Sequence, residues 1–292
     1  MSWLNGLQGR IEHDAPLGAL TWYGLGGRAR HLLHPTGPRE LGQVLQHARD
    51  DGLATKVLGA GANVLITDDG FDGVVIRLDD PSFKRISIDG RTVRVGCGAE
   101  LMTLVRQCSQ RGLAGLEGLA GIPGTVGGAI RMNAGGRHGE IGDVVESVEV
   151  LTPGLDQRVL TREQVGFAYR HTELGDSIVT AATLRLQESE PRKVYARFQE
   201  IWRAKKAAQP MTERSAGCIF ANPPGDSAGR LIDRAGLKGT RCGGARVSER
   251  HANFIVADPG ATAADVLQLI DRVRQTVRQQ FGTELELEID IW

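Results

Sequence analysis

The residues of this chain best suited to chemistry lie in two glycine-rich stretches. The longer is GLEGLAGIPGTVGGAIRMNAGG, residues 115–136, in which eight of the twenty-two residues are glycine. Glycine has no Cβ and adopts φ > 0 readily, so such a stretch lets the backbone approach another group closely. Backbone N–H groups exposed in this way bind anions, and turn chemistry alone needs fewer glycines. The composition predicts a loop that lies against a flat, polyanionic cofactor.

The shorter stretch is GAGANVL, residues 59–65, which follows an expected strand at residues 55–58. A strand that leads into a glycine loop suggests a Rossmann turn, and Asp79 lies twenty residues after Gly59. A Rossmann turn, however, requires a third glycine where Val64 stands and a helix directly afterwards. The sequence has no helical pattern there and reaches another strand at residues 74–76 instead. The pattern therefore indicates a strand–loop–strand unit.

The longer stretch resembles the flavin-binding signature of the UDP-N-acetylenolpyruvoylglucosamine reductases, the MurB family, within the FAD-binding group that resembles vanillyl alcohol oxidase. Further motifs follow in family order, namely TWYGLGG at 21–27, YR at 169–170, SAGCIFANP at 215–223 and LELEI at 285–289. The resemblance covers residues 21–292. It implies the reduction of UDP-N-acetylglucosamine enolpyruvate to UDP-N-acetylmuramate, a peptidoglycan precursor. It also implies non-covalent FAD and NADPH as the hydride donor.

The resemblance assigns roles to particular residues. Arg170 would stabilise the charge that hydride addition creates, Cys218 would donate a proton where most relatives have serine, and Glu288 would orient this assembly or act on a protonated carboxyl. Ala221 stands where a lysine is usual, so one charge contact to the substrate is in question. The implied FAD contacts are Gly59, Ala60, Gly61, Ala62, Asn63, Leu65, Gly121, Ile122, Pro123, Gly124, Thr125, Gly127, Gly128, Ala129, Met132 and Asn133. The implied substrate contacts are Tyr169, Gly217, Asn222 and Arg230.

Hydrophobic periodicity predicts the elements that must position these motifs. The expected helices span 38–52, 101–111, 162–165, 191–209, 227–236 and 263–281, the last with a capping box from Thr262 to Asp265. The expected strands span 55–58, 74–76, 85–88, 92–95, 144–151, 178–186, 251–256 and 284–291. Residues 1–20 show no clear pattern.

The fold that the resemblance implies is α+β. A two-subdomain FAD-binding unit of the vanillyl-alcohol-oxidase type is followed by a smaller α+β substrate-binding domain. The expected divisions are residues 1–75 and 76–190 for the two FAD-binding subdomains and residues 191–292 for the substrate-binding domain.

Composition narrows the class of protein. Formal net charge is zero, which argues against nucleic-acid or anionic-membrane partners. The N-terminus lacks the basic and apolar regions of a secretory signal, and no apolar run approaches the roughly 20 residues of a membrane span. None of the four cysteines forms a C-x-x-C pair, so neither zinc nor a disulfide framework is indicated. We therefore expect a cytoplasmic monomer.

Two other functions stay open at this point. A different FAD-dependent oxidoreductase of the same group would explain the glycine loops, but not Arg170, Cys218 and Glu288 together. A non-catalytic UDP-sugar-binding protein would be consistent with Ala221. Turnover of the enolpyruvyl nucleotide with NADPH separates these alternatives from the reductase.

Overall fold

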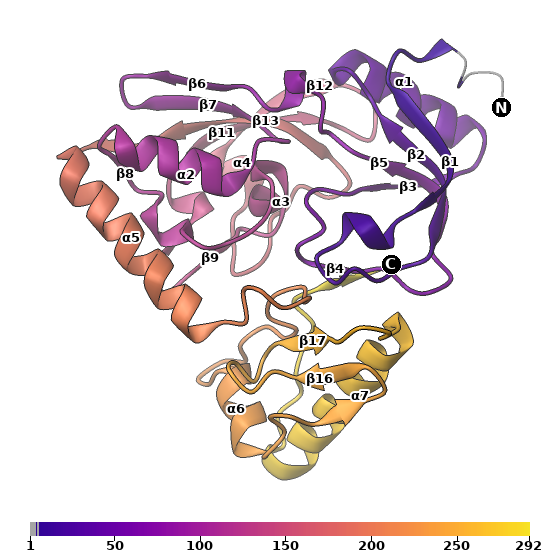
Figure 1. Cartoon of the computed structure of the whole chain (residues 1–292). Helices are drawn as coiled ribbons and strands as arrows, with labels where there is room; N and C mark the ends of the chain where they lie inside the picture. Colours follow the sequence, from indigo (N-terminus) through magenta and orange to yellow (C-terminus); the bar gives the residue numbers. More distant parts are fainter. Residues whose placement is uncertain (1–3, 5) are drawn as a thin grey trace. The chain divides into compact units, whose positions relative to one another are not determined.

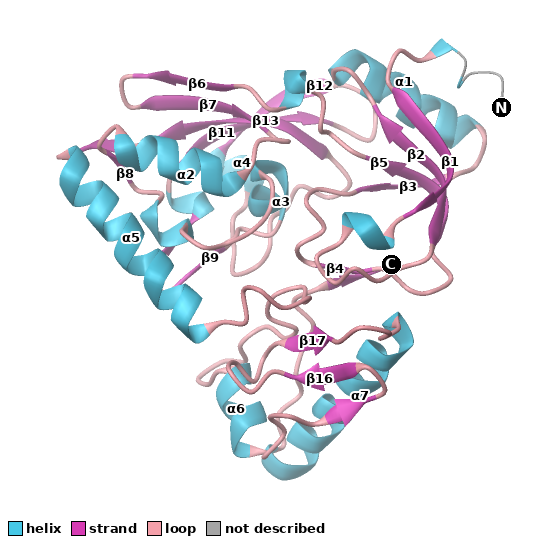
Figure 2. Cartoon of the chain, in the orientation of Figure 1, coloured by secondary structure: helices cyan, strands magenta, loops and turns pink. Residues whose placement is uncertain are grey.

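The computed structural model describes Leu4 and residues 6–292, which form two compact units. Helices and strands occur together in each unit, so the predicted α+β class is confirmed (Figure 2). Unit 1 consists of Met1–His13, His31–Gly59 and Gly73–Lys205, and unit 2 of Asp14–Arg30, Ala60–Asp72 and Lys206–Trp292. The three-part division at residues 75 and 190 stays a prediction.

The main sheet of unit 1 has five strands in the order β12-β11-β13-β7-β6, and each neighbouring pair is antiparallel (Figure 1). The predicted hairpin is confirmed as β6 and β7, with Asp89 paired to Thr92 across the turn. The edge strand β12 was not predicted, because its sequence QRVLT shows little alternation. The strands are β6 (Ile86–Asp89), β7 (Thr92–Gly96), β11 (Val145–Leu151), β12 (Gln157–Thr161) and β13 (Ile178–Arg185).

Helices of unit 1 bury apolar residues in the same core as this sheet, and the sequence predicts each of those described here except the short helix at Val126–Arg131. In α2 (Leu101–Gln110) the buried residues include Leu104, Val105 and Cys108, which share one core with the strands. The short helix α3 (Val126–Arg131) packs against β13 and β7, and α4 (Arg162–Val165) packs against β11. The long helix α5 (Pro191–Ala208) buries Val194, Phe198 and Ile201, as its periodicity predicts.

A smaller sheet has the order β1-β2-β5-β3, with β3 parallel to β5. Helix α1 buries Leu41, Val44 and Ala48 in the same core as Val74 and Ile76 of β5. Strand β1 was not predicted, since residues 1–20 lack a regular pattern. These elements are β1 (Arg10–Pro16), β2 (Arg28–His34), α1 (Pro38–Asp50), β3 (Ala54–Val57) and β5 (Phe71–Ile76).

Helix α7 (Ala263–Phe281) is the main element of the core of unit 2. Its predicted capping box is confirmed, because Thr262 and Asp265 each accept a hydrogen bond from the backbone of the other. The helix packs against a three-stranded antiparallel sheet and α6. The remaining elements of this core are α6 (Ala228–Arg234), β15 (Arg241–Cys242), β16 (Ala245–Val247) and β17 (Ile255–Ala257).

Two N-terminal segments are built into unit 2. Tyr23 is fully buried and its hydroxyl donates to the Ile255 carbonyl at 3.1 Å. Asp68 accepts from the backbone N–H groups of Ala263 and Ala264, both at 3.0 Å, and so caps α7. Strand β4 (Val64–Leu65) pairs in parallel with β18 (Asp290–Ile291). The segment that carries the shorter glycine stretch is thus joined to the C-terminal end of the chain.

Two strand predictions are corrected. Residues 251–254 form a turn, with Phe254 N–H donating to the His251 carbonyl at 2.9 Å, and strand β17 begins only at Ile255. Residues 284–291 do not form one half-buried strand, because Leu287 is 36% exposed and only residues 290–291 are a strand. The segment instead bonds to two separate parts of unit 2.

Short paired segments complete the described structure. Strand β8 (Leu113–Ala114) pairs with β14 (Gln187–Glu188), and β9 (Gly135–Gly136) pairs with β10 (Gly139–Glu140). In the described residues no helix is long and apolar enough to cross a membrane. Nor does that part of the chain contain a group of three His, Cys, Asp or Glu residues able to hold a metal ion.

Candidate active site

The longer glycine stretch is more ordered than a loop. The sequence predicts a loop throughout residues 115–136, whereas the structure has a 3-10 helix at Glu117–Leu119, then α3, then β9. Thr125 begins α3, where its hydroxyl accepts from the Gly128 N–H at 3.3 Å. The helix was not predicted because Gly127 and Gly128 are poor helix formers. Packing against the sheet offsets that preference.

Several of the glycines are required for close packing of backbone on backbone. Gly127 N–H donates to the Cys97 carbonyl at 2.8 Å, and a Cβ on Gly127 would lie 2.9 Å from the Cys97 Cβ. A Cβ on Gly59 would lie 2.8 Å from Thr125 Oγ1, which brings the start of the shorter stretch against the longer one. Burial raises the pKa of the Cys97 thiol to about 12, so Cys97 is a packing residue.

Other glycines leave the space that a cofactor needs. Gly124 has φ +138°, a conformation that side-chain-bearing residues rarely adopt, and a Cβ there would meet nothing within 4 Å. The nearest atom to a Cβ on Gly128 would be Thr125 Oγ1 at 3.5 Å. The stretch thus combines glycines that pack against other segments with glycines that have open space beside them, and we call this arrangement a cradle of bare backbone. These residues therefore fit a flat cofactor.

Asn133 fixes the turn that carries Arg170. Its side chain is buried and its backbone has φ 43°. The amide nitrogen Nδ2 donates to Glu140 Oε1 at 2.6 Å and to the Ala168 carbonyl at 2.9 Å, and Oδ1 accepts from Gly142 N–H at 3.1 Å. The side chain thus bonds to protein on both ends. Its predicted cofactor contact stays a prediction.

Tyr169 and Arg170 form a tight turn next to the glycine stretch. The flanking residues Ala168 and His171 bond to each other in both directions, at 3.0 and 3.1 Å. Arg170 has φ 55°, and a guanidinium nitrogen donates to the Gly135 carbonyl at 3.0 Å. Among the described residues only four other than glycine have positive φ, and two of these are Asn133 and Arg170. Strained backbone of this kind is concentrated at functional sites.

Unit 2 brings together three of the predicted site residues. Glu288 N–H donates to the carbonyl of Ile219, the residue after Cys218, at 2.8 Å. Asn63 Nδ2 donates to the Glu288 carbonyl at 2.9 Å, and Asp290 N–H donates to the Asn63 carbonyl at 3.0 Å. The segments of Asn63, Cys218 and Glu288 therefore lie side by side.

Asn253 supports this arrangement and was not predicted from the sequence. It is 3% exposed, and its Oδ1 accepts from Phe220 N–H at 3.0 Å while Nδ2 donates to the Phe220 carbonyl at 2.7 Å. Its own carbonyl accepts from Ile219 N–H at 2.8 Å. The signal in the sequence was an asparagine inside an otherwise apolar run, because a buried amide must have partners.

The other predicted substrate contacts lie at the surface of unit 2. Asn222 Oδ1 accepts from Ala228 N–H at 3.0 Å at the start of α6. Arg230 forms an exposed ion pair with Asp226 at 2.6 Å. Gly217, directly before Cys218, has φ +79°, and a Cβ there would meet nothing within 4 Å. The substrate contacts of Asn222, Arg230 and Gly217 stay predictions.

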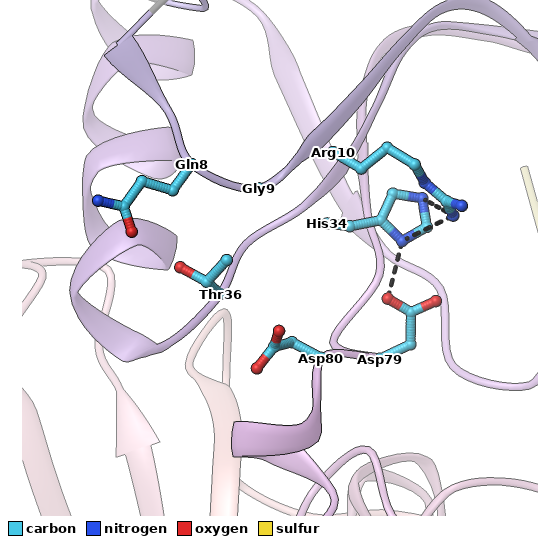
Figure 3. A pocket seen from close by; sticks show the side chains of 7 residues that line it. All are labelled: Gln8, Gly9, Arg10, His34, Thr36, Asp79 and Asp80. Carbon is cyan, nitrogen blue, oxygen red and sulfur yellow. Dashed lines mark hydrogen bonds and ion pairs between the residues drawn. The ribbon is translucent and has the colours of Figure 1, made fainter.

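A separate hollow of about 330 Å³ in unit 1 was not predicted (Figure 3). Within it, His34 Nδ1 lies 2.7 Å from Asp79 Oδ1, and His34 Nε2 lies 2.9 Å from a guanidinium nitrogen of Arg10. Burial opposes ionisation of Asp79, but the bond from His34 and the charge of Arg77 hold its pKa below the ordinary value. These polar groups bond to one another, which is typical of a structural network. The lining residues are Gln8, Gly9, Arg10, His34, Thr36, Asp79 and Asp80.

Comparisons with known proteins identify the family to which this chain is similar. Residues 209–292 match the family described as "UDP-N-acetylenolpyruvoylglucosamine reductase, C-terminal domain". Residues 29–155 match the family described as "FAD binding domain". The UDP-N-acetylenolpyruvoylglucosamine reductase 2 of Symbiobacterium thermophilum is 43% identical over 97% of this chain and 92% of that protein.

Solved structures give the same result. The UDP-N-acetylenolpyruvylglucosamine reductase (MurB) of Thermus caldophilus is 42% identical, with a TM-score of 0.84 over 97% of this chain and 99% of that one. BBE-like 1 of Physcomitrella patens is 19% identical, with a TM-score of 0.51 over 64% of this chain and 44% of that one, a likeness of fold alone. With this identity over nearly its whole length, the chain belongs to the family of UDP-N-acetylenolpyruvoylglucosamine reductases.

Proposed function

We propose that this chain uses FAD and NADPH to reduce UDP-N-acetylglucosamine enolpyruvate to UDP-N-acetylmuramate, a peptidoglycan precursor. The observation that carries the proposal is 43% identity to a named reductase over 97% of the chain. The side-by-side segments of Cys218 and Glu288 in unit 2 support it. We further propose that the protein works as a monomer in the cytoplasm, where its four cysteines are thiols.

The two glycine stretches are the proposed holders of FAD. In unit 1 these are Gly59 and the segment from Gly121 to Asn133, whose open glycines leave room for a flat group. In unit 2 the segment from Ala60 to Leu65 continues the same loop. The sequence has no recognisable site of covalent attachment, so we propose that the cofactor is bound non-covalently. When bound, FAD supplies the hydride chemistry between NADPH and the enolpyruvyl group.

The side chains of the protein must control charge and protons during this reduction. Hydride addition at C3 of the enolpyruvyl ether moves electron density onto C2 and the adjacent carboxylate. Arg170 is suited to stabilise that charge, because a guanidinium stays protonated and can hold a carboxylate with two donors. A proton must then reach C2, and the Cys218 thiol is the proposed donor. We propose that Glu288 orients this assembly, and that Tyr169, Gly217, Asn222 and Arg230 contact the nucleotide sugar.

The direct test of the proposal follows the flavin colour of the purified protein. NADPH should bleach the yellow absorbance under anaerobic conditions, and the enolpyruvyl nucleotide should restore it with one UDP-N-acetylmuramate formed per flavin. Bleaching without recovery would favour a different oxidoreductase of the same FAD-binding group. Tight binding of the nucleotide without bleaching would favour a non-catalytic UDP-sugar-binding protein.

Arg170→Lys should retain FAD and lose most activity, because lysine keeps the charge but lacks the planar fork. The loss should fall on the step with the enolpyruvyl nucleotide, with reduction by NADPH nearly unchanged, since only the former creates charge next to a carboxylate. Stopped-flow absorbance measures the two steps separately, with Arg158→Lys, an exposed arginine of β12, as the control. Equal damage to both steps would contradict the assignment of Arg170.

The variants Cys218→Ser and Cys218→Ala should show whether Cys218 donates a proton or only fills space. A free thiol has a pKa of about 8.5, whereas a serine hydroxyl does not ionise in the working range. Single-turnover oxidation of pre-reduced enzyme by the nucleotide should therefore decline at alkaline pH in the wild type but not in the serine variant. The alanine variant should be slower by roughly 10²–10⁴-fold, the usual contribution of general acid catalysis.

Each outcome for Cys218 has a definite meaning. An alanine variant that reacts at the wild-type rate would remove Cys218 as the donor. A serine variant that keeps the same alkaline decline would assign that decline to another group. Cys108, buried in α2, gives a matched control, and Cys108→Ala should leave the pH profile unchanged.

A further inference from the structure

Two arginines and a histidine form a cluster at the surface of unit 1. Arg137 and His138 are the two residues of the turn between β9 and β10, because Gly136 pairs with Gly139 across it. Arg137 Nε donates to His138 Nε2 at 2.9 Å. A guanidinium nitrogen of Arg197, an exposed residue of α5, lies 3.3 Å from His138 Nδ1. The imidazole ring therefore lies between two guanidinium groups, one at each of its nitrogens.

These side chains offer more hydrogen-bond donors than the ring can accept. A neutral imidazole has one N–H group and one lone pair, and a protonated imidazole has no lone pair. The His138 ring can thus accept from Arg137 or from Arg197, but not from both at once. Each guanidinium also has further N–H groups that these contacts do not use. The cluster is therefore short of acceptors.

The carboxylates of the protein do not balance this cluster. Glu200 pairs with Arg197 at 2.8 Å, and both side chains of this pair are exposed. Glu140, which follows the turn, instead directs Oε1 to the Asn133 amide at 2.6 Å. Among the described residues no carboxylate pairs with Arg137, whose printed partner is the His138 ring. The charge of this arginine therefore has no counterion in that part of the chain.

A third cation is bonded to a segment that packs on the same turn. Lys205, in the last turn of α5, donates to the Gly118 carbonyl at 3.0 Å. Gly118 contacts the turn directly, since a Cβ on it would lie 2.3 Å from the His138 carbonyl oxygen. Within the described structure Lys205 has no carboxylate partner. Two arginines and one lysine, less the one paired glutamate, give a formal net charge of +2.

The turn is joined to the candidate active site through β9. The carbonyl of Gly135 in this strand accepts from the Arg170 guanidinium at 3.0 Å. Gly135 lies two residues before Arg137, and the glycine stretch that is proposed to hold FAD ends at the residue between them. A ligand bound by Arg137 would therefore lie at the end of that stretch.

A phosphomonoester fits this cluster in charge and in oxygen atoms. It carries about 1.5 to 2 negative charges at pH 7 and has three acceptor oxygens. Arginine binds phosphate through two parallel N–H···O bonds, so two guanidinium groups can share the oxygens of one phosphate. Each phosphate within the diphosphate of FAD or of a UDP sugar carries a single charge and has fewer terminal oxygens. Of the molecules in the proposed reaction, NADPH alone has a phosphomonoester, which NADH lacks.

We propose that Arg137 and Arg197, spaced by the His138 ring, bind the phosphate group that distinguishes NADPH from NADH. Lys205 adds positive charge beside them. The inference rests on the proposed function of this chain and names the residues that select its hydride donor. The cluster acts on binding alone, because this phosphate takes no part in hydride transfer.

Calorimetry on the FAD-loaded, oxidised protein tests the proposal without turnover. NADP⁺ carries the phosphomonoester, NAD⁺ lacks it, and neither reduces the flavin. Arg137→Gln and Arg197→Gln should each raise the Kd of NADP⁺ by about tenfold or more, because a charged hydrogen bond is lost, and change the Kd of NAD⁺ by less than about twofold. Arg137→Lys should recover part of the affinity, since lysine keeps the charge but lacks the planar fork.

Anaerobic bleaching of the flavin gives a second readout. The dependence of the bleaching rate on NADPH concentration yields an apparent Kd and a limiting rate. Arg137→Gln should raise the apparent Kd and leave the limiting rate within about twofold of the wild type, the pattern of a group that binds without acting on the transition state. Arg192→Gln, at an exposed arginine in the first turn of α5, is the matched control and should behave as the wild type. Thermal unfolding confirms that each variant is folded.

Four results would overturn the inference. Unchanged NADP⁺ affinity in both glutamine variants would leave the cluster as a solvated surface. Equal weakening of NAD⁺ would remove the phosphomonoester as the ligand. Weakened binding of the enolpyruvyl nucleotide in place of NADP⁺ would assign the cluster to an anionic group of that nucleotide, and loss of FAD from the variants would assign it to the flavin diphosphate. A wild-type protein that NADPH bleaches but that fails to turn over the enolpyruvyl nucleotide would contradict the proposed function and not this inference.

Discussion

The structure of unit 1 depends on close contact between backbone segments that only glycine allows. Gly127 bonds to the Cys97 carbonyl, Gly118 packs on the His138 carbonyl, and Gly59 packs on Thr125. A Cβ at any of these positions would lie between 2.3 and 2.9 Å from another heavy atom, closer than real Cβ contacts. The structure places α3 against β7 and β13, and the preceding 3-10 helix against β9 and β10. The cradle of bare backbone follows from that packing, because the same stretch has open glycines where no contact is made.

The turn that carries Arg170 is positioned by this framework. Asn133 and Arg170 both have left-handed backbone, and such strain persists only where the surroundings fix it. Here the Asn133 side chain bonds to Glu140, Gly142 and Ala168, and Arg170 bonds to the Gly135 carbonyl. Lys205 bonds to the carbonyl of Gly118, a residue that is itself fixed by packing. In unit 2, Asn63 and Ile219 bond to the backbone of Glu288 and so fix the position of this segment.

The sequence predicted what local signals determine and missed what distant partners determine. Helix α7 was predicted with its capping box because Thr262, Asp265 and the apolar stripe lie within one stretch of chain. The alternation in residues 284–291 predicted one strand. In the structure, however, the Glu286 carbonyl accepts from Ala221 N–H and Glu288 N–H donates to the Ile219 carbonyl, whereas Asp290 N–H donates to the Asn63 carbonyl, so the segment bonds to two different parts of the chain. Helix α3 was missed because its glycines disfavour a helix in isolation. The roles of the glycine motifs, Cys218 and Glu288 stay predictions from the sequence, whereas the buried Asn253 was not predicted, because its hydrogen bonds depend on which residues fold beside it.

The central claim is that the packed glycines create the cofactor site, and one pair of variants tests it directly. Gly127 and Gly136 lie in the same stretch, but a Cβ meets Cys97 at 2.9 Å in the first case and nothing within 4 Å in the second. The measurement is the Kd of the flavin-free protein for FAD, from flavin fluorescence, with thermal unfolding to confirm that both variants are folded. Gly127→Ala should weaken FAD binding about tenfold or more, the effect of overpacking, and Gly136→Ala by less than about twofold. A folded Gly127→Ala protein that binds FAD as tightly as the wild type would contradict the account.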